Sequence, residues 1–134
     1  DSMIHSFSLR VYYEDTDLAG IVYYANYLKF IERGRSTLIR EVGIDQLFLK
    51  KQGYLFAVKS LTADYHASAQ MDDELTVKTV LISVSGAKII FDQRVFNSNK
   101  LLFSSIVTIA YVTTGGRPVR LPSKTIEKLQ QFAA

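Results

Sequence analysis

The stretch YYANYLKFIERGRSTLIREVG, residues 23–43, decides the fold because it predicts one long helix. Its apolar residues recur at the spacing of an α-helix, and they are Leu28, Ile31, Leu38, Ile39 and Val42. The helix is expected to run from about Tyr24 to Val42. It should stop at Gly43, since glycine is the residue most typical of the position that follows a helix.

Aromatic residues add further apolar surface to the first half of this helix, and they are Tyr23, Tyr24, Tyr27 and Phe30. A helix that is apolar on most sides is buried, so we expect the rest of the chain to wrap around it. Gly34 lies in the helix interior, where glycine is less favourable than alanine by about 1 kcal/mol. Its presence predicts that another stretch of backbone approaches the helix there.

Strands are expected on both sides of the helix, because apolar and polar residues alternate there. Residues 4–13 form the first strand, with Phe7, Leu9, Val11 and Tyr13 on one face. After a short helical turn over residues 45–51, the alternation resumes past Gly53 and continues to Thr113. Turn sequences at residues 71–74, 85–86 and 97–100 divide this region into a meander of four long antiparallel strands.

The order of these elements predicts an α+β fold, in which a five-stranded antiparallel sheet wraps around one long central helix. A short terminal helix with Ile126, Leu129 and Ala133 on its apolar side completes the chain. The length of 134 residues suits one domain, residues 1–134. Residues 1–2 precede Met3 and are expected to be a tag remnant.

The composition excludes several classes of function. With no cysteine and only His5 and His66 as histidines, the chain lacks disulfides, cysteine nucleophiles and the ligands of a three-histidine metal site. The net charge is +3, from 16 basic and 13 acidic residues, which is too small to indicate nucleic-acid binding. Neither a membrane span nor a signal peptide is recognisable, so a cytoplasmic location is expected.

Three acidic residues, Glu14, Asp15 and Asp17, stand in a loop just before the predicted helix. Acidic side chains at such a position stabilise the helix dipole by about 0.3–1 kcal/mol each, so a purely structural role is one interpretation. A calcium loop and a phosphatase loop of the DxDxT type both fit poorly, because Ala19 replaces a required side-chain oxygen in each. A third interpretation is a base or nucleophile beside the amides that begin the helix, which suits hydrolysis of an activated acyl group.

The run VYYEDTDLAGIVYYANY, residues 11–27, resembles the opening of hotdog-fold acyl-CoA thioesterases. The likeness continues through residues 30–35, Asp72-Asp73, Arg117-Pro118 and Leu121-Pro122, so it spans roughly residues 9–128. It is strongest to the YbgC-like branch, associated with the Tol-Pal system, within the 4-hydroxybenzoyl-CoA thioesterase group. The resemblance implies hydrolysis of acyl-CoA to a free acid and CoA, with no metal or cofactor.

The resemblance also assigns roles to residues. The family's catalytic aspartate falls on Asp17, as nucleophile or general base, and its oxyanion-binding amide falls on the backbone of Tyr24. Residues expected to contact the substrate are Gly20, Val22, Tyr23, Tyr27, Lys88 and Arg117, the last two through the phosphates of CoA. Two departures bear on substrate binding: many members of the branch have histidine in place of Tyr24, and many have arginine in place of Ser85.

The resemblance further implies a homo-oligomer, either a dimer or a tetramer, with active sites between subunits. Assembly would cover the edges and the outer face of the sheet. An acyl carrier or a Tol-Pal protein is a further candidate partner, with attachment at the periphery of the inner membrane. The alternative function is a non-catalytic acyl-CoA-binding or scaffold module of the cell-envelope Tol-Pal system.

Overall fold

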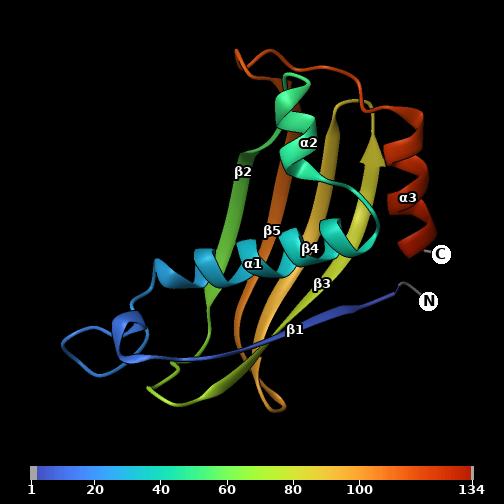
Figure 1. The fold of residues 1–134 in the computed structure, drawn as a ribbon. Coiled ribbons are helices and arrows are strands. Elements are labelled where there is room, and N and C mark those ends of the chain that lie inside the picture. The colour runs from blue at the N-terminus through green and yellow to red at the C-terminus, as the bar shows by residue number, and fades with distance from the viewer. Residues whose placement is uncertain (1–2, 134) are drawn as a thin grey trace.

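Residues 3–133 are described by the structure, a computed structural model, and the expected tag remnant at residues 1–2 lies outside them. The strands are β1 (His5–Arg10), β2 (Tyr54–Tyr65), β3 (Glu74–Ser85), β4 (Lys88–Asn97) and β5 (Lys100–Thr113). The helices are α1 (Asn26–Glu41), α2 (Gln46–Lys51) and α3 (Ser123–Ala133), with a 3-10 helix at Tyr13–Asp15. The predicted long helix, short helical turn and terminal helix are therefore confirmed (Figure 1).

The five strands form one antiparallel sheet in the order β1-β3-β4-β5-β2, which confirms the predicted fold class. The predicted meander of four strands is wrong in one respect. β3, β4 and β5 follow one another through short turns, but β2 pairs with β5 at the edge opposite β1. The connection after β2 explains the difference, because residues 66–73 are long enough to carry the chain past the ends of two strands to β3.

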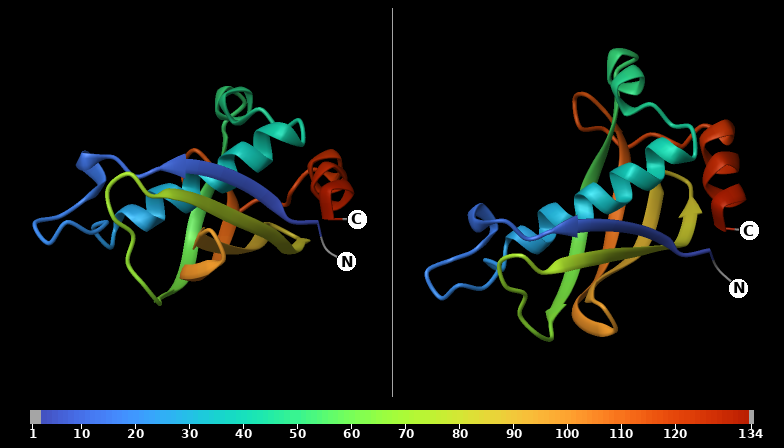
Figure 2. Two further views of the ribbon diagram at one scale, coloured as in Figure 1. Left: turned by 90° about the horizontal axis from the view of Figure 1, so that it is seen from below. Right: turned by 60° about the horizontal axis from the view of Figure 1, so that its bottom comes forward.

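The helix α1 lies along the inner face of the sheet, which curves around it (Figures 1 and 2). Its buried residues are Tyr27, Phe30, Ile31, Gly34, Leu38 and Ile39. The strands contribute fully buried residues to the same core, among them Leu75, Val77, Phe91, Val95 and Phe103. Full burial of such an apolar side chain contributes about 1.5–3 kcal/mol, so each of these contacts between α1 and the sheet stabilises the fold.

The residues just before α1 are less buried than the sequence predicts. Tyr23 and Tyr24 are 47% and 61% exposed, because they precede the first turn of α1, which projects past the edge strand β2 (Figure 1). Leu28 is exposed as well. Tyr13, expected on the inner face of the first strand, is also exposed, since β1 ends at Arg10 and Tyr13 begins the 3-10 helix.

Gly34 marks a close approach, but of a side chain and not of the predicted backbone. A Cβ atom at this position would lie 2.7 Å from Cγ1 of Val77 in β3. Nearby, the buried side chain of Gln93 donates hydrogen bonds to the carbonyl of Ile31 (2.8 Å) and to the hydroxyl of Thr79 (2.9 Å). A buried amide requires such partners, and these two bonds tie α1 to the sheet at one register.

The terminal helix α3 packs beside β3 and buries Leu129 completely. Among the described residues, none of the helices combines the length and the apolar character that a bilayer crossing requires.

Candidate active site

The acidic loop before α1 folds back on itself as a narrow hairpin. Thr16 and Val22 form a β-bridge, and the amide of Asp17 donates to the carbonyl of Ile21 at 2.9 Å. Gly20 closes the turn with φ +81° and donates its amide to the carbonyl of Asp17. A side chain at Gly20 would meet no neighbour, so the requirement for glycine comes from its backbone conformation alone.

Asp17 and Asp15, of which the resemblance assigns only Asp17 a catalytic role, have different surroundings. Asp15 is structural: its carboxylate accepts the amide of Tyr12, and its carbonyl accepts the amide of Tyr23 and the side-chain amide of Asn26. Asp17 is half-buried, and its Oδ1 accepts the amide of Ala19 at 2.9 Å. Within residues 3–133, Oδ2 of Asp17 has no hydrogen-bond partner, so this oxygen is available for chemistry.

The start of α1 is open to a ligand. Ala25 holds the N-cap position, where alanine cannot accept a hydrogen bond, and no side chain caps the helix. Within residues 3–133, the amides of Tyr24 and Ala25 donate to no acceptor. Uncapped amides at a helix N-terminus attract a negatively charged oxygen, so the arrangement can stabilise the oxyanion that forms when a thioester carbonyl is attacked.

A cavity of about 310 Å³ opens beside these amides. Its lining consists of Ile21, Val22, Tyr24, Tyr27, Tyr65, His66, Ala67 and Ser68. The ring of Tyr27 stacks on Phe103 at 5.2 Å, its hydroxyl accepts the amide of Ala69 at 3.3 Å, and burial raises its pKa. Asp17 is not part of the lining, but its hairpin contributes Ile21 and Val22 to the wall.

Two cavity residues, Tyr65 and His66, were not among the predicted site residues. Tyr65 ends β2 and donates its hydroxyl to the carbonyl of Tyr24 at 2.9 Å. His66 lies just beyond β2, where its Nε2 is 2.9 Å from the hydroxyl of Ser104. Because Tyr65 and Tyr24 are far apart in sequence, no local pattern could have paired them.

The predicted site residues fall into two groups in one chain. Gly20, Val22, Tyr23 and Tyr27 lie with Asp17 and Tyr24 in the hairpin and at the start of α1. Lys88 lies elsewhere. It aligns with Ala110 of β5, which pairs in turn with Ala57 of β2. Ala57 is eight residues before the end of β2, so Lys88 is roughly 25 Å along the strand from the end where Tyr65 lies. Arg117 is exposed at the same distant end, where its amide and carbonyl bond to Thr113.

Lys88 has a basic neighbour. Its contact with Lys59, at the bulge of β2, lowers the pKa of Lys59. Among the described residues, neither lysine forms a salt bridge with a carboxylate. The positive charge of Lys88 disfavours the charged form of Lys59, which is the physical reason for the lowered pKa.

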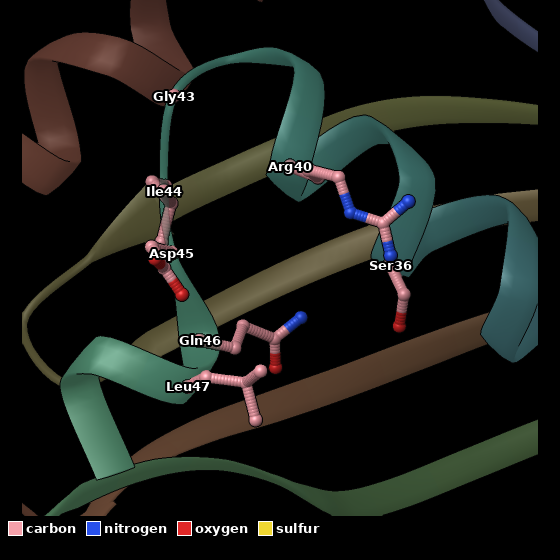
Figure 3. A pocket seen from close by; sticks show the side chains of 7 residues that line it. All are labelled: Ser36, Arg40, Gly43, Ile44, Asp45, Gln46 and Leu47. Atoms are coloured by element: carbon pink, nitrogen blue, oxygen red, sulfur yellow. The ribbon is translucent and has the colours of Figure 1, made fainter. Parts of the chain in front are cut away.

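A larger cavity, about 420 Å³, lies at the other end of α1 (Figure 3). Ser36 and Arg40 of α1 face Gln46 and Leu47 at the start of α2 across it. It contains none of the predicted catalytic residues, and the helix that begins there, α2, has a side-chain cap, because Asp45 accepts the amide of Phe48 at 3.1 Å. We therefore place the candidate active site at the smaller cavity. Within residues 3–133, no cluster of three or more histidine, aspartate or glutamate side chains is placed to hold a metal ion.

Comparisons with known proteins show which family the chain belongs to. The model of the thioesterase-like superfamily matches residues 11–129. The chain is 42% identical over 121 residues to the acyl-CoA thioesterase YbgC of Haemophilus influenzae, covering 89% of each chain. It is 33% identical over 125 residues to the acyl-CoA thioester hydrolase YbgC of Escherichia coli, covering 92% of this chain and 93% of the relative.

A solved structure gives the same result. The crystal structure of a probable thioesterase from Bartonella henselae superposes with a TM-score of 0.85 at 36% identity, covering 89% of this chain and 99% of the other. The predicted hotdog fold and the resemblance to the YbgC branch are thus both confirmed. The chain belongs to the thioesterase-like superfamily.

Proposed function

We propose that this chain, as one domain over residues 1–134, hydrolyses acyl-CoA thioesters to a free acid and CoA in the cytoplasm. The observation that carries the proposal is the position of the Asp17 hairpin beside the uncapped start of α1, where the amides of Tyr24 and Ala25 have no acceptor within residues 3–133. Relatives that match about nine-tenths of the chain have names that describe the same reaction.

In the proposed reaction, the thioester carbonyl oxygen accepts hydrogen bonds from the amide of Tyr24 and, with it, that of Ala25. These bonds strengthen as negative charge develops on the oxygen, and one such donor typically contributes about 10²–10³ in rate. By one route Asp17 attacks the carbonyl carbon, expels the CoA thiolate and forms a mixed anhydride that water then hydrolyses. By the other route Asp17 takes a proton from a water molecule that attacks directly.

The acyl group is proposed to occupy the cavity beside Tyr24. Its walls are largely apolar and aromatic, with Val22 and Tyr27 buried. Tyr23 is not part of the lining, but its ring packs 5.0 Å from that of Tyr24, which is. Because Gly20 has no side chain and adopts a positive φ, the hairpin can turn tightly beside the reacting group. We propose that Lys88, Lys59 and Arg117 bind the CoA phosphates, since ammonium and guanidinium groups form charge-assisted hydrogen bonds with phosphate oxygens.

A homodimer is proposed to bring these two groups together. The 12-residue strand β2 has a partner on one side only within residues 3–133, so its other edge is free to pair with a second copy. Two identical edges related by a two-fold axis through the sheet pair antiparallel. The end of the sheet that carries Lys88 in one copy then lies beside the end that carries Tyr24 in the other copy. Within one chain these two ends are separated by roughly 25 Å along β2, so they cannot form one site.

Charges beside the β2 edge support this dimer. The guanidinium of Arg35 lies in a groove with Ile39, Phe56 and Val58, and its burial lowers its pKa. It donates a 3.4 Å hydrogen bond to Oε1 of Gln93 and, within residues 3–133, forms no salt bridge, although a buried charge is most stable when an opposite charge pairs with it. Glu32 lines the same groove one turn away. In a two-fold dimer, Glu32 of each copy would pair with Arg35 of the other.

The alternative function is a non-catalytic acyl-CoA-binding or scaffold module at the cell envelope, peripheral to the inner membrane. The observation that favours it is the apolar surface on the hairpin and the segment before it, where Tyr12, Tyr13 and Leu18 are all exposed. Exposed apolar clusters of this kind mark contacts with other proteins. An acyl carrier or a Tol-Pal protein would be the partner there.

The test is an assay of CoA release over a series of acyl-CoA substrates, from short aliphatic to aromatic and long-chain groups. Hydrolysis by the purified chain, with a preference among acyl groups, supports the proposal. Binding of acyl-CoA without hydrolysis of any member contradicts it and favours the scaffold function. Light scattering tests the dimer, and a monomer at micromolar concentration would contradict it.

A further inference from the structure

We propose that Tyr65 is a positioning residue for the oxyanion-binding amides, an inference that rests on the proposed thioester hydrolysis. Tyr65 is the last residue of β2, and its hydroxyl donates a 2.9 Å hydrogen bond to the carbonyl oxygen of Tyr24. No part of Tyr65 needs to touch the reacting atoms in this role. It acts by holding the peptide group that carries the free amide of Ala25.

The direction of that amide follows from peptide geometry. In a planar trans peptide the C=O and N–H bonds point in opposite directions. The carbonyl of Tyr24 and the amide of Ala25 belong to one peptide group, so the bond from Tyr65 directs the Ala25 amide away from β2. The preceding peptide group, which carries the Tyr24 amide, is held in the same way, because the amide of Asn26 donates to the carbonyl of Tyr23 at 2.8 Å.

The backbone of α1 does not hold the peptide group that joins Tyr24 to Ala25. In a regular helix the amide of Leu28 would donate to the carbonyl of Tyr24. Here the Leu28 amide donates to Ala25 instead, at 3.1 Å. Within residues 3–133, the hydroxyl of Tyr65 is the only group that donates a hydrogen bond to the Tyr24 carbonyl. One peptide group is therefore fixed by the backbone of α1, and the other depends on a side chain from the sheet.

The ring of Tyr65 is 47% exposed, and its covered side packs against three other rings. It makes edge-to-face contacts with Phe103 at 5.0 Å, Tyr27 at 5.7 Å and Tyr24 at 6.1 Å. Burial raises the pKa of its hydroxyl above the ordinary tyrosine value, so the group stays protonated and remains a donor in the neutral range. Because three rings fix the side chain, removing the hydroxyl alone leaves its packing intact.

The test compares Tyr65→Phe with a matched control, Tyr111→Phe. Tyr111 is also packed against aromatic rings, Tyr54 and Phe56, but it lies at the other end of the sheet and its hydroxyl has no hydrogen-bond partner among the described residues. We expect Tyr65→Phe to lower kcat roughly 10- to 50-fold with KM within about twofold, since misaligning an oxyanion donor affects the transition state more than the bound substrate. Tyr111→Phe should leave both constants unchanged.

A second readout is hydrogen exchange of the amides of residues 23–28, which does not depend on turnover. We expect faster exchange there in Tyr65→Phe than in the parent chain, with no change in Tyr111→Phe. Unchanged kcat in Tyr65→Phe, an equal loss in both variants, or a rise in KM at constant kcat would overturn the inference. If the parent chain does not hydrolyse acyl-CoA, the proposed function fails. Unchanged hydrogen exchange in Tyr65→Phe would show independently that the Tyr65 hydroxyl does not fix the Tyr24–Ala25 peptide group.

Discussion

The two ends of α1 are finished in opposite ways. At the C-terminal end, Gly43 adopts φ +93°, its amide donates to Arg40 at 3.0 Å, and the amide of Ile44 donates to Ile39 at 3.1 Å. This is a Schellman motif, in which the chain satisfies its own last carbonyls. The ammonium of Lys128 in α3 adds a 2.9 Å bond to the carbonyl of Gly43.

The N-terminal end has no such closure. Alanine occupies the cap position, the side chain of Asn26 bonds to Asp15 and not to the helix, and the amides of Tyr24 and Ala25 have no acceptor within residues 3–133. The C-terminal end therefore stabilises the fold, and the N-terminal end retains the capacity to bind an oxyanion. This difference predicts that substitutions at the N-terminal end lower activity, whereas substitutions at the C-terminal end lower stability.

The largest effect is expected from Asp17→Asn, next to the open end. The substitution preserves shape and can still accept the amide of Ala19, so the melting temperature should change little. The turnover number should fall by at least about 100-fold, because the neutral amide is neither a nucleophile nor a base. Steady-state kinetics and thermal unfolding of the same samples measure both.

Glu14→Gln is the matched control, since Glu14 is exposed in the same acidic segment and has no hydrogen bond among the described residues. It should retain the rate of the parent chain. Equal rates for Asp17→Asn and the parent would remove Asp17 from the mechanism.

At the closed end, Gly43→Ala should lower the free energy of unfolding by about 1–2 kcal/mol, which is the strain of a left-handed conformation at alanine. Crowding adds nothing, because the nearest atom to the new Cβ would be 3.9 Å away, in the side chain of Lys128. Urea denaturation measures the loss. The turnover number per folded molecule should not change, and a fall in turnover without a loss of stability would break the contrast between the two ends.

A smaller effect is expected from Lys88→Ala, far from both catalytic groups in one chain. KM for acyl-CoA should rise about twofold to fivefold, as for the loss of one exposed charge contact, and the rise should shrink with added salt. KM for an acyl-pantetheine thioester, which lacks the nucleotide, should stay constant. The exposed residue Lys100 provides the control variant, Lys100→Ala. Equal effects on both substrates would separate Lys88 from the CoA phosphates.

The smallest effect is expected from Tyr24→Phe. Within residues 3–133 the hydroxyl of Tyr24 makes no hydrogen bond, and only its backbone is assigned to the oxyanion. The variant should keep at least about a third of the parent turnover number, which is less than 1 kcal/mol of transition-state stabilisation. A loss beyond tenfold would show that the phenol orients substrate or water.

Much of the fold could be predicted from local patterns. The helical spacing from Leu28 to Val42, the glycine at position 43 and the alternation after Gly53 each reflect a residue's nearest neighbours in the chain. The errors concern contacts between distant segments. Nothing local states that β2 pairs with β5, that Val77 packs on Gly34, or that Tyr23 and Tyr24 precede the covered part of α1.

The site divides in the same way. The resemblance placed Asp17, Gly20, Val22, Tyr23, Tyr24 and Tyr27 in one segment, and the chain keeps them together because they are neighbours in sequence. Lys88 and Arg117 are assigned to the same site only through their expected contact with CoA. Within one chain they lie at the other end of the sheet. Tyr65 was missed because its bond to Tyr24 exists only once the sheet has folded.

The most direct test of the account is a crystal structure of the Asp17→Asn variant with an unhydrolysed acyl-CoA bound. We expect the thioester carbonyl oxygen to lie within hydrogen-bond distance of the Tyr24 or Ala25 amide, with the side chain at position 17 beside the carbonyl carbon. A thioester carbonyl bound instead by Ser36, Arg40 and Gln46, in the cavity between α1 and α2 (Figure 3), would contradict it.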